Sequence, residues 1–212
     1  DSMKNAKYVN DFFASAKVII DKMPCEDVDK VIELLFNAWK NGSTVFLIGN
    51  GGSASTATHM AADLAKTMNV DGKKRLKAFA LVDNIPMVSA LTNDNGWENI
   101  YVEQLMTYFR SGDVVVAFSV HGGSGKDKAG AWSQNLLKAL QYAKDNGGKA
   151  VGFAGFDGGA MKEMAELGPE YKDVTFSINL SGQSLAPEHL SKVFREGIEK
   201  YQLSPSRFLF EI

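Results

Sequence analysis

The 212-residue sequence is poor in cysteine, in net charge and in long apolar runs, and each shortage excludes a class of protein. A single cysteine, Cys25, excludes an internal disulfide framework and a CxxC metal or redox motif, and it is compatible with a reducing cytoplasm. The formal net charge of -2, with scattered basic residues, argues against a nucleic-acid partner. No run approaches the roughly 18 apolar residues of a membrane span, and no secretory pattern opens the chain. We therefore expect a cytoplasmic protein with neither a membrane nor a nucleic-acid partner.

What the sequence does contain is an alternation of short apolar strands with helices. Strands are predicted over Thr44–Ile48, Lys77–Val82, Asp113–Val120, Lys149–Gly155 and Asp173–Leu180. Helices are predicted over Asn5–Met23, Glu26–Lys40, Ala54–Met68, Ile100–Tyr108 and Ser133–Asn146. Strands that are apolar on both faces indicate a parallel sheet covered by helices on both sides. The predicted fold class is therefore α/β.

The stretch VFLIGNGGSAS, residues 45–55, leaves the first predicted strand through a glycine-rich turn and enters a helix. Such a turn lets the backbone approach a ligand closely, and the helix N-terminus offers unpaired N–H groups to an anion. The turn lacks the GK[ST] of a Walker loop, and serines stand where GxGxxG requires its last glycine. The sequence thus predicts an anion site and no nucleotide cofactor.

A second strand end, AFSVHGGSGKDK, has a similar composition, with Ser119 at the tip of the strand and Ser124 in the following loop. Two parallel strands that end in serine and glycine loops place hydroxyl donors on the same edge of a sheet, where open α/β folds bind ligands. A phosphate monoester with a polar tail suits such a cleft. The alternative is a pair of ordinary tight turns rich in glycine and serine.

Four motifs in order resemble the sugar isomerase (SIS) domain of the phosphoheptose isomerase family. They are GNGGSASTATHMAADLAK, LTNDNGWENIYVEQL, SGDVVVAFSVHGGSG and GGKAVGFAGFDGGAM, and the resemblance covers about Lys7 to Leu167. It implies a flavodoxin-like three-layer sandwich with a mainly parallel five-stranded sheet, and a homotetramer. It also implies a phosphorylated-sugar substrate, sedoheptulose 7-phosphate, which such enzymes convert to a manno-heptose 7-phosphate.

The resemblance also implies roles for individual residues at matching positions. The residues that would hold the phosphate are Ser53, Ser119 and Ser124. The residues that would contact the sugar are Asn50, Gly51 and Gly52 in the first turn and the pair Asn93 and Asp94. His121 stands where the family has a small hydroxyl residue, and we expect it to contact the substrate.

Isomerisation of a ketose to an aldose through an enediol needs a base that moves a proton, and an acid or metal that polarises the carbonyl. His59 and Asp63 are four residues apart, so on a helix they share a face and could bind a zinc ion or the substrate. The family resembled here has Glu at the second position, so Asp63 has a shorter reach. The alternative for His59 is a structural polar residue on a half-buried helix face.

The last 45 residues depart from the family pattern, because they lack its C-terminal Gln and His pair. The stretches SINLSGQSL and FLFEI instead resemble a strand-helix-strand fragment of an EAL-type cyclic-di-GMP phosphodiesterase barrel. In that family Asn179 and Glu211 would match metal ligands, but the EAL signature itself is absent. His189 is then the only histidine that could reach the cleft from this side, as a third catalytic candidate beside His59 and Asp63.

This reading divides the chain into three parts. Residues 1–3 are interpreted as an expression scar, residues 4–168 as the SIS-type phosphosugar domain, and residues 169–212 as the EAL-like segment that completes it. A chimera joined near Gly168 would add an extra strand over 207–212.

Three functions remain open from the sequence. The first is ketose-aldose isomerisation of a phosphorylated heptose, with or without zinc at His59 and Asp63. The second is a phosphosugar-binding SIS module without turnover, which the missing C-terminal pair favours. The third is an engineered scaffold that joins fragments of two folds.

Overall fold

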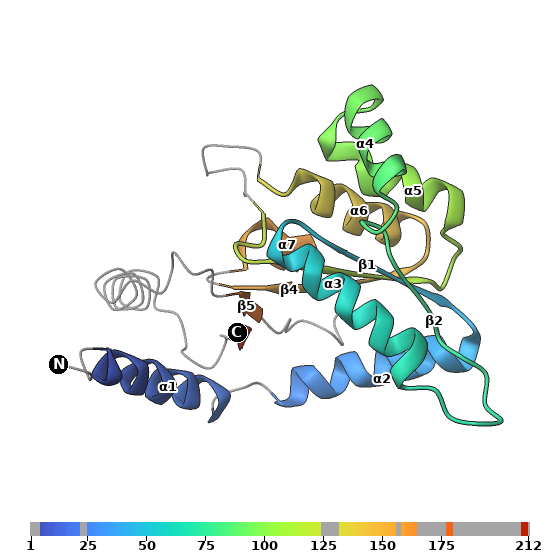
Figure 1. Cartoon of the computed structure of the whole chain (residues 1–212). Helices are drawn as coiled ribbons and strands as arrows, with labels where there is room; N and C mark the ends of the chain where they lie inside the picture. Colours follow the sequence, from blue (N-terminus) through green and yellow to red (C-terminus); the bar gives the residue numbers. More distant parts are fainter. Residues whose placement is uncertain are drawn as a thin grey trace.

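A four-stranded parallel sheet forms the centre of the protein in the computed structural model (Figure 1). The structure describes residues 5–21, 25–123, 132–155, 158–164, 177–179 and 209–211. The strand order is β2-β1-β3-β4, and each neighbouring pair is parallel. The strands are β1 (Thr44–Gly49), β2 (Lys77–Ala80), β3 (Val114–Ser119) and β4 (Lys149–Ala154). Their positions match the four predicted strands, because short apolar runs with helices between them favour a parallel sheet.

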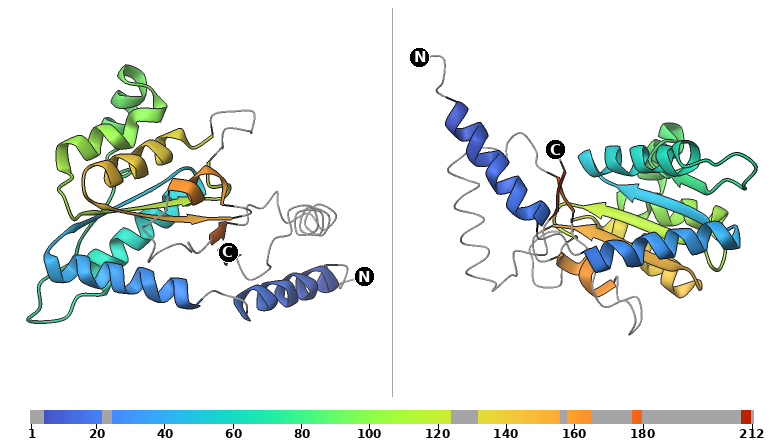
Figure 2. Two further views of the ribbon diagram at one scale, coloured as in Figure 1. Left: turned by 180° about the vertical axis from the view of Figure 1, so that it is seen from behind. Right: turned by 90° about the horizontal axis from the view of Figure 1, so that it is seen from below.

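The two faces of the sheet bury two separate apolar cores. Phe46 and Ile48 of β1 point to one core, whereas Val45 and Leu47 point to the other, as the pleat of a strand requires. Figure 2 shows helices on both sides of the sheet. The first core is covered by α5 (Ile100–Tyr108), α6 (Gln134–Asp145) and α7 (Gly159–Met164). The second is covered by α2 (Cys25–Asn41) and α3 (Gly52–Ala62).

The three layers confirm the predicted α/β class. Three helical segments lie outside the predicted ranges or change type: α4 (Ile85–Asp94), the short 3-10 turn η2 (Trp97–Asn99) and the π-type turn η1 (Asp63–Thr67) that continues α3. The start of α4 is signalled locally, because Asn84 accepts a hydrogen bond from Met87 N and Pro86 occupies the first turn.

The N-terminal helix α1 (Ala6–Asp21) projects beyond the sheet in Figures 1 and 2. No α1 residue whose exposure is described is buried, and Val9, Phe13, Val18 and Ile20 expose apolar side chains. Its apolar stripe is therefore not covered by the described part of this chain. No helix among the described residues is both long enough and apolar enough to cross a membrane.

The expectation of a five-stranded main sheet differs from the described part of the chain, where the main sheet has four strands. The segment predicted as the fifth strand is described only at β5 (Ser177–Asn179), which pairs in parallel with β6 (Leu209–Glu211) in a separate two-stranded sheet. The extra C-terminal strand is likewise not seen as an addition to the main sheet.

Candidate functional site

The glycine-rich turn between β1 and α3 closes tightly at two glycines. A Cβ at Gly49 would clash with the carbonyl of Ser53, so no larger residue fits there. Gly51 has a φ of 57°, a left-handed conformation that glycine adopts without strain. Ser53 N then donates to Asn50 O at 3.1 Å, which starts the first turn of α3. The turn therefore brings backbone and the positive end of the α3 dipole to the edge of the sheet.

Tyr101 of α5 holds this turn in place through a hydrogen bond to its backbone. Its side chain is fully buried, and its hydroxyl donates a hydrogen bond of 2.5 Å to Gly49 O. Burial raises the pKa of the Tyr101 phenol to about 12, because the charged phenolate would lose its hydration there. Sequence reasoning missed Tyr101, which reads as an apolar position of the helix.

The end of β3 lies beside this turn, because the register pairs Gly49 with Phe118. Ser119 follows at the tip of the strand, and its exposed fraction is only 8%. Its Oγ accepts a hydrogen bond of 3.1 Å from Gly122 N. Since the oxygen serves as acceptor there, the Ser119 hydroxyl proton remains able to donate to a ligand.

Both strand ends open into one pocket of about 230 Å³. Its lining comprises Asn50, Ser53, Phe118, Ser119, Val120, His121, Trp132, Ser133 and Leu136. The structure thus brings together four of the predicted site residues, namely Asn50, Ser53, Ser119 and His121. Gly51 and Gly52 belong to the turn beside the pocket, at the start of α3.

Asn135 in the first turn of α6 joins the two halves of the pocket, and sequence reasoning missed it. It is fully buried and exchanges two side-chain hydrogen bonds with Asn50, of 2.9 and 2.8 Å. Its Oδ1 also accepts from Leu136 N at 3.0 Å. The signal that could have found Asn135 is its place just after the predicted helix start at Ser133, where amide side chains commonly bond to the backbone.

Trp132 and His121 form the outer wall of the pocket. Their ring centroids are 5.5 Å apart at an angle of 48°. Two aromatic rings at this distance restrict the opening and provide an apolar surface beside the polar interior. We did not anticipate Trp132, because it follows the loop after Ser119 with no periodicity of its own.

The electrostatics of the pocket favour an anion. Its lining holds serine hydroxyls, an asparagine amide and the N-terminus of α3, and none of its described residues is acidic. Hydroxyl donors at the positive end of a helix suit a phosphate or carboxylate group. The geometry is therefore that of an anion pocket with one aromatic wall.

The pair His59 and Asp63 lies further along, with His59 on α3 and Asp63 at the start of η1. His59 Nε2 is 3.4 Å from Asp63 Oδ2, and the two side chains are 81% and 51% exposed. Thr67 donates a hydrogen bond of 3.0 Å to Asp63 Oδ1, so both carboxylate oxygens have a partner. The predicted spacing on one helix face is confirmed, but neither residue lines the pocket.

The remaining predicted residues are not placed in the pocket. Asn93 Nδ2 donates to Asp94 Oδ1 at 2.7 Å, and both residues are exposed at the end of α4. Ser124 and His189 lie outside the described residues.

A zinc site is not formed by the described residues. His59 and Asp63 supply two ligands, whereas mononuclear zinc sites have at least three from the protein. Among the residues that the structure describes, no group of three or more His, Cys, Asp or Glu side chains is arranged to hold a metal ion. The described donor set therefore does not fit zinc.

A family model described as the SIS domain matches residues 7–155. The chain belongs to the SIS domain family. Within it the chain is phosphoheptose isomerase-like: the phosphoheptose isomerase of Clostridium acetobutylicum is 32% identical over 168 residues, covering 78% of this chain and 81% of that protein.

This SIS domain is also similar to a protein of antibiotic biosynthesis. The lincomycin biosynthesis protein LmbN of Streptomyces lincolnensis is 45% identical over 135 residues, covering 64% of this chain and 48% of LmbN. The chain thus spans about half the length of that relative.

The fold of this SIS domain agrees with a solved structure of similar size. A phosphoheptose isomerase structure from Francisella tularensis superposes with a TM-score of 0.70, covering 95% of this chain and 100% of that one, at 21% identity. Nothing in the structure or in these comparisons supports an EAL chimera over residues 169–212. The likeness rested on the stretches SINLSGQSL and FLFEI alone.

Proposed function

We propose that this SIS domain binds a phosphorylated sugar and places the phosphate in the pocket between β1 and β3. The observation that carries the proposal is the meeting of Ser53, Ser119 and the α3 N-terminus in a pocket whose described lining has no acidic residue. Hydroxyl and backbone N–H donors around one pocket match the oxygens of a phosphate monoester.

We further propose ketose-aldose isomerisation, with sedoheptulose 7-phosphate as the substrate and a manno-heptose 7-phosphate as the product. The relatives named phosphoheptose isomerase support this choice. The open-chain sugar would extend from Ser53 and Ser119 along Asn50 and the first turn of α3, with Ser124 adding a third phosphate contact.

The chemical step moves a proton between adjacent carbons, and His59 with Asp63 is the proposed acid-base pair. If the hydrogen on His59 Nε2 faces Asp63, the Nδ1 lone pair is left to accept the proton. Asp63 fixes this tautomer, and Thr67 holds the carboxylate in place. Asn93 and Asp94 are proposed to contact the open chain, and His189 to act as a second proton carrier.

Because His59 is exposed, a second subunit would be needed to exclude water from the reacting carbons. We propose a homotetramer in which α1 is the contact, since Val9, Phe13 and Ile20, which share one face of the helix, are exposed. Light scattering tests this directly. A monomer at micromolar concentration would contradict it.

A phosphosugar-binding module without turnover is the second candidate. The observation that favours it is the separation of His59 and Asp63 from the residues that line the pocket. In that case phosphate binding is retained and no proton is moved.

An NMR time course separates the two candidates. The purified protein is incubated with sedoheptulose 7-phosphate, with and without added zinc, and new aldose signals and saturation transfer to the ketose are recorded together. Aldose above a no-protein control supports the isomerase, and transfer without aldose supports the binding module. Absence of both signals would contradict both candidates.

A further inference from the structure

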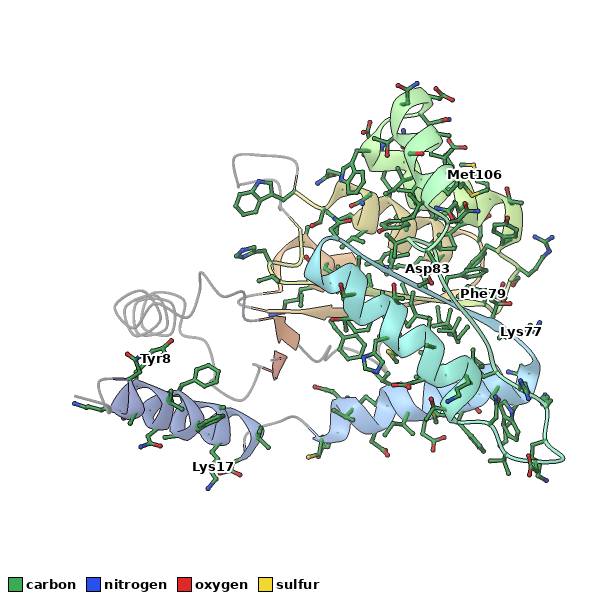
Figure 3. All side chains as sticks on the ribbon, in the orientation of Figure 1. Tyr8, Lys17, Lys77, Phe79, Asp83 and Met106 are labelled. Atoms are coloured by element: carbon green, nitrogen blue, oxygen red, sulfur yellow. The ribbon has the colours of Figure 1, made fainter. Side chains whose placement is uncertain are left out.

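A second pocket of about 670 Å³ follows the outer edge of β2, and it shares no lining residue with the anion pocket. β2 is one of the two edge strands of the main sheet, and Ala78, Phe79 and Ala80 of β2 line the pocket. Figure 3 labels Phe79 and Asp83 in the space between α3 and α5, with Met106 beyond them. The volume is within the range of about 300–1,000 Å³ that is usual for small-molecule sites.

This second pocket, called the edge pocket, has mainly apolar walls. Ala61 of α3 and Ala65 of η1 pack in the same core as the strand residues Ala78 and Ala80, so small side chains line this part of the pocket. Phe79 lies on the opposite side of the strand, 55% exposed, with its ring stacked on Phe46 at 6.4 Å. A flat ring would cover the open face of Phe79 and gain an aromatic contact.

Two side chains of the edge pocket, Asp83 and Gln104, carry acceptor oxygens. Asp83 is its one carboxylate, held by a hydrogen bond of 2.9 Å from Thr58 Oγ1, and the pocket lining contains no Lys or Arg. Gln104 is 3% exposed and donates its amide to Ile100 O at 2.8 Å. The other end of this amide, Gln104 Oε1, is an acceptor oxygen on a side chain that lines the pocket.

We propose that the edge pocket binds a small aromatic amine, with its flat ring against Phe79 and its protonated nitrogen at Asp83. The charge and the acceptors select a cationic donor over a neutral or anionic molecule of the same shape. This site is independent of the phosphosugar pocket, because the two share no residue. The SIS domain then binds a cationic ligand in the edge pocket and an anionic ligand in the anion pocket.

The test compares three indole probes of one shape and three charges, namely tryptamine, tryptophol and indole-3-acetate, by two-dimensional NMR titration of the full chain. We expect saturable shifts at Phe79, Asp83 and Gln104 with tryptamine, and weaker binding by about tenfold or more with the other two. The variant Asp83→Asn keeps the shape and should lower tryptamine affinity by a similar factor. Asp71→Asn, an exposed acid in the loop before β2, is the matched control and should change nothing.

Three outcomes would overturn the proposal: no saturable shift with tryptamine, equal affinity for all three probes, or unchanged affinity in Asp83→Asn. If a second copy of the chain covers Phe79 in solution, tryptamine will fail to bind the oligomer, which also overturns it. The variant Ser119→Ala should bind tryptamine normally. Loss of tryptamine binding there would move the site to the anion pocket, whereas loss of phosphosugar binding alone leaves the edge pocket intact.

Discussion

Asn50 and Asn135 are 85 positions apart in the chain, and their side-chain amides exchange two hydrogen bonds of 2.9 and 2.8 Å. One residue belongs to the turn after β1 and the other to the first turn of α6. The reciprocal pair satisfies amide groups that would be costly to bury alone, and it holds the two loops at a fixed separation. The anion pocket therefore depends on a contact that no local sequence pattern contains.

Replacement of Asn135 by Ala should destabilise the protein by about 1–3 kcal/mol, because Asn50 would lose its partner in a part-buried position. Urea denaturation measures this cost, and calorimetry with a phosphosugar should show weaker binding. Asn146→Ala removes an amide at the exposed end of the same helix and is the control. Equal costs for the two variants would contradict the special role of the pair.

Ser119→Ala should weaken phosphosugar binding by about tenfold, since the loss of one hydroxyl donor to a charged phosphate costs about 1.5 kcal/mol. The same variant removes the acceptor for Gly122 N, so the loop after β3 should also loosen. Ser55→Ala, on the exposed side of α3, serves as the matched control in the same titration. Unchanged affinity would remove Ser119 from the site.

Asp63→Asn should abolish isomerisation and leave phosphosugar binding intact, because the pair with His59 lies outside the pocket that holds the phosphate. The measurement is the aldose yield by NMR beside the affinity by calorimetry. Asp63→Glu lengthens the carboxylate by one methylene and should retain activity. An active Asp63→Asn protein would show that the proton is moved by other groups.

Tyr101→Phe should change how the free energy of unfolding depends on pH in alkaline solution. The folded state keeps the phenol protonated up to a pKa of about 12, whereas the unfolded chain releases the proton near 10. Stability supplied by this group is therefore complete below pH 10 and declines by about 3 kcal/mol as the pH rises to about 12. Tyr101→Phe should lose about 1 kcal/mol at neutral pH, with its hydrogen bond, and lack this part of the alkaline decline. Urea denaturation of both proteins from pH 9 to about 12 measures the free energy of unfolding at each pH. If it declines equally with pH in both proteins, the burial effect is contradicted.

Gly49→Ala should cost about 3 kcal/mol, because the added Cβ would clash with the carbonyl of Ser53 and the backbone must shift. Gly72→Ala is the control: its φ is 73°, but nothing lies near the added atom, so only a conformational cost of about 1 kcal/mol is expected. Thermal unfolding compares them. A smaller cost at Gly49 would mean that the turn relaxes freely.

The α/β class and the four strands could be predicted, because short apolar runs and glycine-rich turns are local signals. A strand was also predicted where β5 lies, but its pairing with β6 could not be predicted, since strand pairing depends on contacts far along the chain. Likewise the spacing of His59 and Asp63 fixed their common helix face. Helix packing decides whether this face lines the anion pocket, and neither His59 nor Asp63 lines it.

The sequence by itself determined that Gly49, Gly51 and Ser53 form a turn at the end of a buried strand, because steric limits and helix initiation act within a few residues. Only the tertiary structure decided that Ser119 and Asn135 lie beside that turn, and that Asp83 and Gln104 share a pocket at the edge of β2. Such meetings depend on the strand order and on how the helices pack across both faces, which are properties of the whole buried core.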